Sequence, residues 1–335
     1  MGKTYLTSES LAQVALRILA LATALVLATA CSREPAQDSP QASEPVAAVH
    51  ALANHLQAND LRAFARAAVP PGEHARLAEA WRSGHSRWPL TELPLDDQLS
   101  PLLLALAAPD SERQLQQAFN SNLARQHRDL REAARALGLF GASWIARDGA
   151  YTEEQRQHYA QLVQAMSRWA QQAPLGDPAL GAAAIDTLAA AARATGLTTE
   201  ESMREAGMEE TLGRLSPFVA GARTVLAGYG LDFNASHAAL RVALVEQDGE
   251  RARVRIAYPV ASTQVDTVLS LERRGGQWYL AGYLREAERV LASAARAPAA
   301  AGLAVPGEAG EAGEGGDGGG GATGSGTAAE AENPR

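Results

Sequence analysis

The chain has 335 residues, of which 38 are Asp or Glu and 30 are Lys or Arg, giving a formal net charge of −8. This acidic balance argues against a general nucleic-acid-binding protein, because such proteins need a basic face. Cys31 is the only cysteine and Lys3 the only lysine. No intramolecular disulfide can therefore form, and the chain after Lys3 can supply neither a Schiff-base lysine nor a Walker A lysine.

The first 30 residues have the pattern of an export signal. Lys3 and Arg17 are the only basic residues among them, and an uncharged run of thirteen residues follows from 18 to 30. This run suits the apolar centre of a signal peptide and is short for a transmembrane helix, which needs roughly 20 apolar residues. We therefore predict that residues 1–30 are removed on export.

Small residues, Ala28-Thr29-Ala30, stand directly before Cys31. This arrangement resembles the lipobox of bacterial lipoproteins, which implies cleavage before Cys31 and attachment of diacylglycerol and an amide-linked acyl chain, such as palmitate, to that cysteine. Two or more acyl chains anchor a protein stably in a bilayer. By the same resemblance, Ser32 indicates the outer membrane, with the protein facing the periplasm. The alternative is an ordinary secretory signal cut after Ala30, which leaves Cys31 as an incidental thiol.

We expect residues 31–45 to form a flexible tether, because they are rich in Ser, Pro, Gln and Glu. Residues 46–236 read as a mostly helical region, since apolar residues recur with helical spacing between recognisable start and stop signals. The signals are Asp60 before a helix ending at Pro70-Pro71, Pro109-Asp110 before a helix ending at Gly138, the capping boxes Thr152/Gln155 and Thr198/Glu201, Asp177-Pro178 before a helix ending near Gly196, and Ser216-Pro217 before a helix ending at Gly228.

After residue 236 the apolar period changes from helical to two, which predicts strands. The pattern indicates four antiparallel strands around 240–244, 254–258, 265–271 and 278–280, with Asp248-Gly249 and Gly275-Gly276 as turns, and a closing helix over 283–296. Such a meander buries one face. The predicted fold class is α+β, a mostly helical body with a C-terminal four-stranded antiparallel β-meander. Region 237–296 either shares one core with the helices or packs separately.

Residues 297–335 consist mainly of Gly, Ala and Glu, so we expect a disordered acidic tail that cannot offset its ordering entropy. The C-terminal region also has a partial resemblance to a known family. Residues 46–68 followed by 237–284 are similar to parts of NTF2-like domains of exported proteins. The similar pieces are the helix that contains Asn59-Asp60-Leu61 and the strand that ends with Gly276-Gln277-Trp278-Tyr279-Leu280. The resemblance implies a curved antiparallel sheet that wraps helices around a cone-shaped pocket, and it transfers no catalytic residues.

No catalytic, cofactor or metal site is predicted. The seven histidines form no local ligand pair. Ser143 lacks the second glycine of a nucleophile elbow, so we interpret 141–145 as a turn with Trp144 packing inward. Adjacent acidic residues do not face each other on a helix, and those in first turns stabilise the helix dipole. The adjacent pairs are Asp96-Asp97, Glu153-Glu154, Glu200-Glu201 and Glu209-Glu210. Trp81 and Trp88 either line a ligand site or pack in the core, and we favour packing.

One candidate binding surface lies on the predicted sheet. Arg251, Arg253 and Arg255 alternate with apolar residues, so all three share the face opposite the core. Arg241 on the preceding strand has the same parity. This arginine stripe could bind an anion such as lipid phosphate or peptidoglycan carboxylates. The alternative is a solvated strand face, with Glu246 and Asp266 as local counter-charges.

These features favour a membrane-anchored envelope lipoprotein that acts as a non-catalytic binding or scaffolding module. Its expected partners are the bilayer, through acylated Cys31, and an envelope protein or an anionic envelope polymer. One alternative is a periplasmic hydrolase with a dispersed active site. Another is a small-molecule carrier that uses an NTF2-like pocket.

Overall fold

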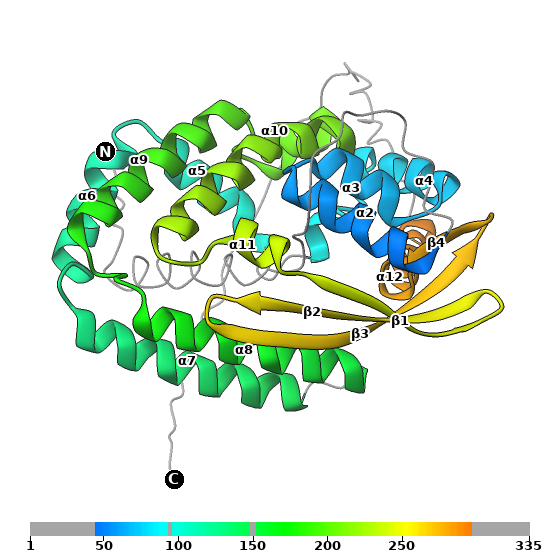
Figure 1. Ribbon diagram of the computed structural model, residues 1–335. Helices are drawn as coiled ribbons and strands as arrows, with labels where there is room; N and C mark the ends of the chain where they lie inside the picture. Colours follow the sequence, from blue (N-terminus) through cyan, green and yellow to red (C-terminus); the bar gives the residue numbers. More distant parts are fainter. Residues whose placement is uncertain (1–43, 93–95, 148–151, 297–335) are drawn as a thin grey trace, which may run out of the picture. The chain divides into compact units, whose positions relative to one another are not determined.

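The computed structural model describes residues 44–92, 96–147 and 152–296. Within these ranges it confirms the predicted α+β class, because a mostly helical body precedes a four-stranded antiparallel sheet and a closing helix (Figure 1). The predicted signal peptide, Cys31 and the acidic tail lie outside the described residues.

The first three helices are α2 (Pro45–Gln57), α3 (Leu61–Ala68) and α4 (Pro71–Arg82). Asp60 caps α3 as predicted, since its side chain accepts a hydrogen bond from the Ala63 backbone NH. Trp81 and Trp88 are both buried, which confirms that they pack in the core. The Trp81 indole also donates a hydrogen bond to the Met203 carbonyl at 2.9 Å, so it links α4 to a distant part of the chain.

Next come two 3₁₀ turns (Leu90–Glu92 and Asp96–Gln98) and the helices α5 (Leu99–Ala107), α6 (Ser111–Asn122), α7 (His127–Arg147) and α8 (Glu153–Gln172). The prediction of a single helix from Asp110 to Gly138 is wrong. The helix α6 ends at Asn122, a second helix, α7, begins at His127, and α7 continues through Gly138. The turn predicted at 141–145 is also wrong. Ser143 lies within α7, and Trp144 is 51% exposed rather than packed inward.

Gly138 lies at a close approach of α7 to α8. A Cβ atom at this position would lie 2.5 Å from the Cβ of Ser167. Ser167 cannot easily turn away, because its hydroxyl donates to the Ala134 carbonyl of α7 at 3.0 Å and accepts from Gln171 at 3.1 Å. The glycine therefore serves helix packing rather than helix termination.

We expect Gly138→Ala to lower the free energy of unfolding by about 1–3 kcal/mol, because overpacking outweighs the better helix propensity of alanine. Gly72→Ala is the control, since nothing lies within 4 Å of a Cβ added there. That change should leave stability unaltered or raise it by up to about 1 kcal/mol. Chemical denaturation of both variants measures the difference, and equal stabilities would contradict the close approach.

The remaining helices of the body are α9 (Pro178–Thr195), α10 (Glu200–Gly228) and α11 (Phe233–Ala238). The caps of α9 at Asp177 and Gly196 are confirmed. The second capping box is one residue later than predicted and consists of Thr199 and Ser202. The predicted helix start at Ser216-Pro217 is wrong, because Pro217 lies inside α10 and the kink is at Gly207, whose φ is +79°.

The sheet has the order β1-β2-β3-β4, formed by β1 (Arg241–Asp248), β2 (Arg251–Val260), β3 (Thr263–Arg274) and β4 (Gln277–Leu280). The helix α12 (Ala281–Arg296) closes the fold. Burial alternates along β2 as predicted. In β1 it does not. This strand lies at the edge of the sheet, where Leu244 and Val245 are about half exposed, and a bulge between Leu244 and Glu246 shifts its register.

Two apolar clusters hold these elements together. One is formed mainly by α3, α4, α5, α9, α10 and α12. The other joins the buried face of the sheet to α2, α8 and α11. Leu280 at the end of β4 packs against both clusters. The sheet therefore buries its apolar face against helices from both ends of the described chain.

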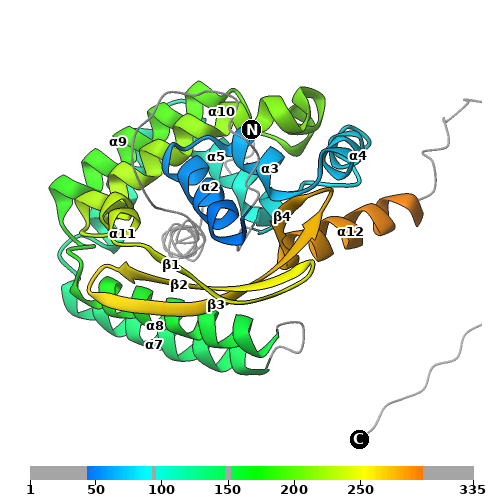
Figure 2. The same cartoon turned by 45° about the vertical axis from the view of Figure 1, so that its right-hand side comes forward.

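The helix α8 also covers part of an open sheet edge (Figure 2). Only the C-terminal end of β3 pairs with β4, so the first half of β3 has a strand on one side only. The Gln161 side chain of α8 donates to the Asp266 carbonyl at 2.8 Å and accepts from the Asp266 NH at 3.0 Å. These bonds satisfy backbone groups that an edge strand otherwise leaves free, and they fix α8 against β3.

Candidate functional site

The main candidate site is a cleft of about 1300 Å³. Four segments line it: the loop 84–91 that follows α4, the first turns of α8, the middle of β3, and α12. Glu200 at the start of α10 also contributes. Segments far apart in the sequence thus meet at this cleft, which explains why no local motif revealed it.

The helix α12 supplies a basic wall. Leu284, Ala287 and Leu291 are buried, so the opposite side of the helix faces the cleft. That side carries Arg285 and Arg289 at a spacing of four, which places them one above the other. Arg289 forms an ion pair with Glu286. Within the described part of the chain, Arg285 forms no ion pair.

This wall was not among the predicted binding surfaces, although the sequence carries a signal of it. The arginines at 285, 289 and 296 recur with helical spacing in the predicted closing helix. All three line the cleft. The spacing identifies one face of a helix, but it cannot show that this face meets a cleft.

The start of α8 forms the opposite wall. The predicted capping box is confirmed, since Thr152 accepts from the Gln155 NH and the Gln155 side chain accepts from the Thr152 NH. It fixes the start of α8, where Glu154 in the first turn and His158 in the second line the cleft. The Nε2 atom of His158 lies 2.8 Å from the hydroxyl oxygen of Tyr258 on β2.

His158 is a neutral anchor rather than a charged ligand. It is 5% exposed, and this burial lowers its pKa to about 4. Burial also raises the pKa of Tyr258 above its ordinary value. Both groups are therefore uncharged near neutral pH, and their hydrogen bond holds the first turns of α8 against the sheet.

The floor of the cleft is part of β3 and continues onto the arginine stripe. The strand register places Val268 opposite Arg255 and Ser270 opposite Arg253, and both β3 residues line the cleft. Glu154, from the α8 wall, lies 3.8 Å from Arg253. The cleft and the exposed face of β2 therefore form one continuous surface.

The structure confirms that the four predicted stripe arginines are exposed on one face of the sheet. Arg251, Arg253 and Arg255 alternate with buried residues of β2. Arg241 faces Ala257, so it shares their side. The suggested counter-charges are present as well, with Asp266 3.5 Å from Arg255 and Glu246 3.9 Å from Arg253. Anion binding by this stripe stays a prediction.

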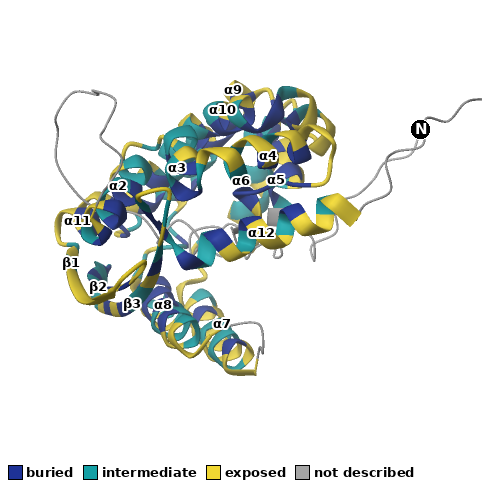
Figure 3. Cartoon of the chain, turned by 90° about the vertical axis from the view of Figure 1, so that its right-hand side faces the viewer, coloured by how far each residue is buried: buried dark blue, intermediate teal, exposed yellow. Residues whose placement is uncertain are grey.

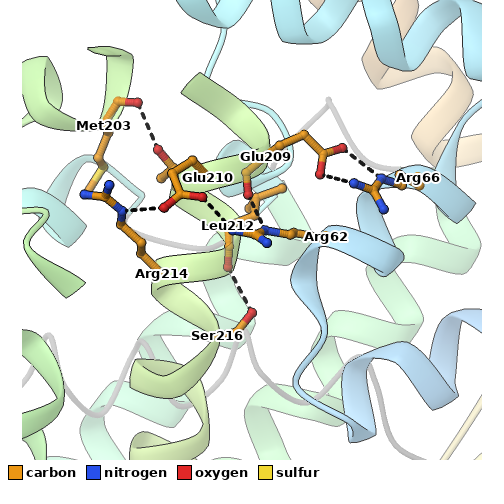
Figure 4. A network of polar contacts seen from close by, with 9 residues as sticks. Arg62, Arg66, Met203, Glu209, Glu210, Leu212, Arg214 and Ser216 are labelled. Atoms are coloured by element: carbon orange, nitrogen blue, oxygen red, sulfur yellow. Dashed lines mark hydrogen bonds and ion pairs between the residues drawn. The ribbon is translucent and has the colours of Figure 1, made fainter. Parts of the chain in front are cut away.

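The adjacent acidic residues mostly face arginines. In Figure 4, Arg62 and Arg66 of α3 reach the carboxylates of α10. Arg66 pairs with Glu209 at 2.6 Å, and Arg62 pairs with Glu210 at 2.8 Å while donating to the Glu209 carbonyl at 2.7 Å. Glu200 pairs with Arg87 at 2.8 Å on the rim of the cleft. Carboxylates held in this way fix one element against another.

Membrane-spanning helices, metal sites and known relatives would each indicate the type of protein. No helix among the described residues is long and apolar enough to cross a membrane. Within the same ranges, no group of three or more His, Cys, Asp or Glu side chains could hold a metal ion. Comparison with protein-family models, curated proteins and solved structures finds no match for the chain.

Proposed function

We propose that the protein is a lipid-anchored binding module of the bacterial envelope whose cleft takes a carboxylate-bearing polymer. The observation that carries this proposal is the row of α12 arginines facing a cleft of about 1300 Å³. This volume exceeds the roughly 300–1,000 Å³ typical of small-molecule sites, so it suits a segment of a larger chain.

The lining of the cleft favours a peptide-like ligand. Arginine binds carboxylates well, because its guanidinium donates two parallel hydrogen bonds. Glu154 and Glu200 on the other walls can accept hydrogen bonds from amines or hydroxyls. Peptidoglycan carries carboxylates, amines and sugar rings on one polymer, so it is the ligand class that we propose.

The cleft presents binding groups more clearly than reaction groups. A histidine with a pKa of about 4, as at His158, is a weak general base at neutral pH. Among the described residues, no hydrogen bond joins a histidine of the cleft to one of its serine or threonine hydroxyls. The hydrolase and the NTF2-like carrier stay predictions from the sequence.

Co-sedimentation with isolated peptidoglycan sacculi tests the ligand. We expect the wild-type protein to pellet with sacculi and the double variant Arg285→Gln/Arg289→Gln to bind about tenfold more weakly, since two charge-assisted contacts are lost. Both side chains are exposed, so the fold should be retained. Circular dichroism of the variant checks this.

The double variant Arg241→Gln/Arg251→Gln is the matched control, because it removes the same charge from the stripe. Its binding should match that of the wild type. If the control loses binding while the α12 variant keeps it, the anion site is the stripe and not the cleft. If the wild-type protein stays in the supernatant, peptidoglycan is not the ligand and the proposal fails.

The lipid anchor has its own test. Intact mass analysis of the membrane-extracted protein should show a mature chain that starts at Cys31 and carries diacylglyceryl and acyl masses. The Cys31→Ser variant should lack them. A wild-type chain that is unmodified and cut after Ala30 would mean a free periplasmic or secreted protein.

A further inference from the structure

The outer side of α7 carries a patch of large apolar residues exposed to solvent. Leu139 is 66% exposed, Phe140 is 69% exposed and Trp144 is 51% exposed. Phe140 and Trp144 are four residues apart, so they lie one above the other, and Leu139 lies about 100° around the helix from Phe140, still on the exposed half of α7. We call these three residues the α7 patch.

The α7 patch faces away from the rest of the described fold. The buried residues of α7 are Ala134 and Ile145, on the other side of the helix. Figures 2 and 3 both show α8 between α7 and the strands, and Figure 3 shows exposed residues along the outer side of α7.

Arginines flank the patch at both ends. Arg135 precedes Leu139 by four residues, and Arg147 follows Trp144 by three, so both lie beside the patch on the helix surface. In the described part of the chain neither arginine pairs with a carboxylate. Arg147 instead bonds to the hydroxyl and carbonyl of Ser143. Exposed aromatic and aliphatic residues between arginines are typical of helices that lie in a membrane interface.

We propose that the outer face of α7 docks onto an anionic lipid surface, with the α7 patch inserted among the acyl chains and Arg135 and Arg147 at the phosphates. A second copy of the chain suits this face poorly. In a two-fold contact between antiparallel α7 helices, Arg135 of one copy would approach Arg147 of the other, and like charges repel.

The choice of a bilayer as the occupant rests on the proposed anchor at Cys31. The thirteen residues 32–44 cannot extend beyond about 45 Å. The helix α2 packs on the sheet, the sheet on α8, and α8 on α7. Three packing steps of about 10 Å each separate the start of α2 from α7, so an anchored chain can place α7 on the same membrane.

Vesicle flotation tests the docking without the anchor. The protein is the mature chain, residues 31–335, with Cys31→Ser, so acylation plays no part. We expect it to float with vesicles of phosphatidylethanolamine and phosphatidylglycerol and to bind far less to phosphatidylcholine. Raising the salt concentration should weaken binding, because it screens the arginines. The emission of Trp144 should shift to the blue on binding.

Phe140→Ser/Leu139→Ser should lower vesicle binding by about tenfold, since two apolar side chains no longer insert. The control Leu104→Ser/Val245→Ser removes two exposed apolar residues of other elements and should bind normally. Three results would overturn the docking proposal. The first is that the Cys31→Ser chain does not float, and the second is that both double variants lose vesicle binding equally. The third is that the protein forms a dimer which Phe140→Ser/Leu139→Ser disrupts. The mass analysis decides the anchor separately, so either idea can fail alone.

Discussion

Replacing Arg223 with methionine is expected to lower the free energy of unfolding by about 3–5 kcal/mol. Arg223 is only 8% exposed and lies on α10 beneath the turn between α2 and α3. Its Nη1 atom donates to the carbonyls of Leu56 and Gln57 at 2.8 and 2.9 Å, and to Asn59 at 2.9 Å. A methionine of similar length would fill the space but remove this donor from all three acceptors, and the Leu56 carbonyl would keep only the bond from the Asn59 NH at 3.0 Å.

The same guanidinium joins a third element to this turn. Its Nη2 atom donates to Asn234 of α11 at 3.0 Å, and its centre lies 5.8 Å from the ring centroid of Phe233. The last carbonyls of α2 have no donor within their own helix, and the C-terminal end of a helix carries partial negative charge. The Arg223 guanidinium therefore stabilises this end both by its hydrogen bonds and by its charge. Burial lowers the pKa of Arg223 from its ordinary value, while Asp232 acts in the opposite direction. Arginine stays charged in spite of this burial.

Urea denaturation of Arg223→Met, Arg223→Lys and Arg113→Met measures the effect. Lysine keeps the charge but cannot reach all four acceptors, so it should be intermediate. Arg113 is an exposed arginine paired with Asp110, and its loss should cost less than about 0.5 kcal/mol. If Arg223→Met loses less than about 1 kcal/mol, the turn and α11 are held by packing and not by this guanidinium.

The parts of the fold that the sequence predicted are those with local causes. Asp60 and Asp177 cap helices because their carboxylates reach NH groups two or three residues away. The glycine turn at Gly275-Gly276 follows from backbone conformations with positive φ, which glycine adopts readily. Local signals of this kind need no knowledge of what packs nearby.

The parts that were predicted wrongly depend on distant neighbours. Gly138 resembles a helix C-cap in sequence, but Ser167 on another helix explains why it is glycine. The apolar alternation of β1 resembles a buried strand, but β1 lies at the edge of the sheet and Leu244 is about half exposed there. The cleft was missed for the same reason, since its walls are brought together only by packing. The arginine stripe was found because a two-residue period defines its face without any tertiary information.

Lowering the pH from 7 to 4 is expected to remove about 3 kcal/mol of stability through His158 alone. Its pKa is about 4 in the folded protein and 6.5 when unfolded, so the unfolded chain takes up a proton first as the pH falls. The contribution is complete above pH 6.5 and is lost progressively toward pH 4. The cause is burial, because a charged imidazole beside Tyr258 would have little contact with water.

Other groups titrate nearby, so the test compares variants rather than absolute curves. His237 also has a pKa lowered to about 4, with burial as the main cause and Arg223 and His50 as further causes. Its contribution falls in the same pH window. The pKa of Glu112 is lowered to about 2, mainly by a hydrogen bond from Arg193, so it acts at lower pH. None of these is changed by substituting His158.

The variant His158→Gln places an amide near the Tyr258 hydroxyl but cannot take up a proton. It should be less stable than the wild type at pH 7, and its disadvantage should shrink and then reverse as the pH falls below about 5. His127→Gln changes an exposed histidine and should follow the wild-type curve. Denaturation midpoints between pH 4 and 8 give the three curves. Parallel curves for His158→Gln and the wild type would mean that His158 gains its proton with no penalty, so that water reaches it. In that case the first turns of α8 would separate from β2 readily, and the α8 wall of the cleft would be a moving element rather than a fixed one.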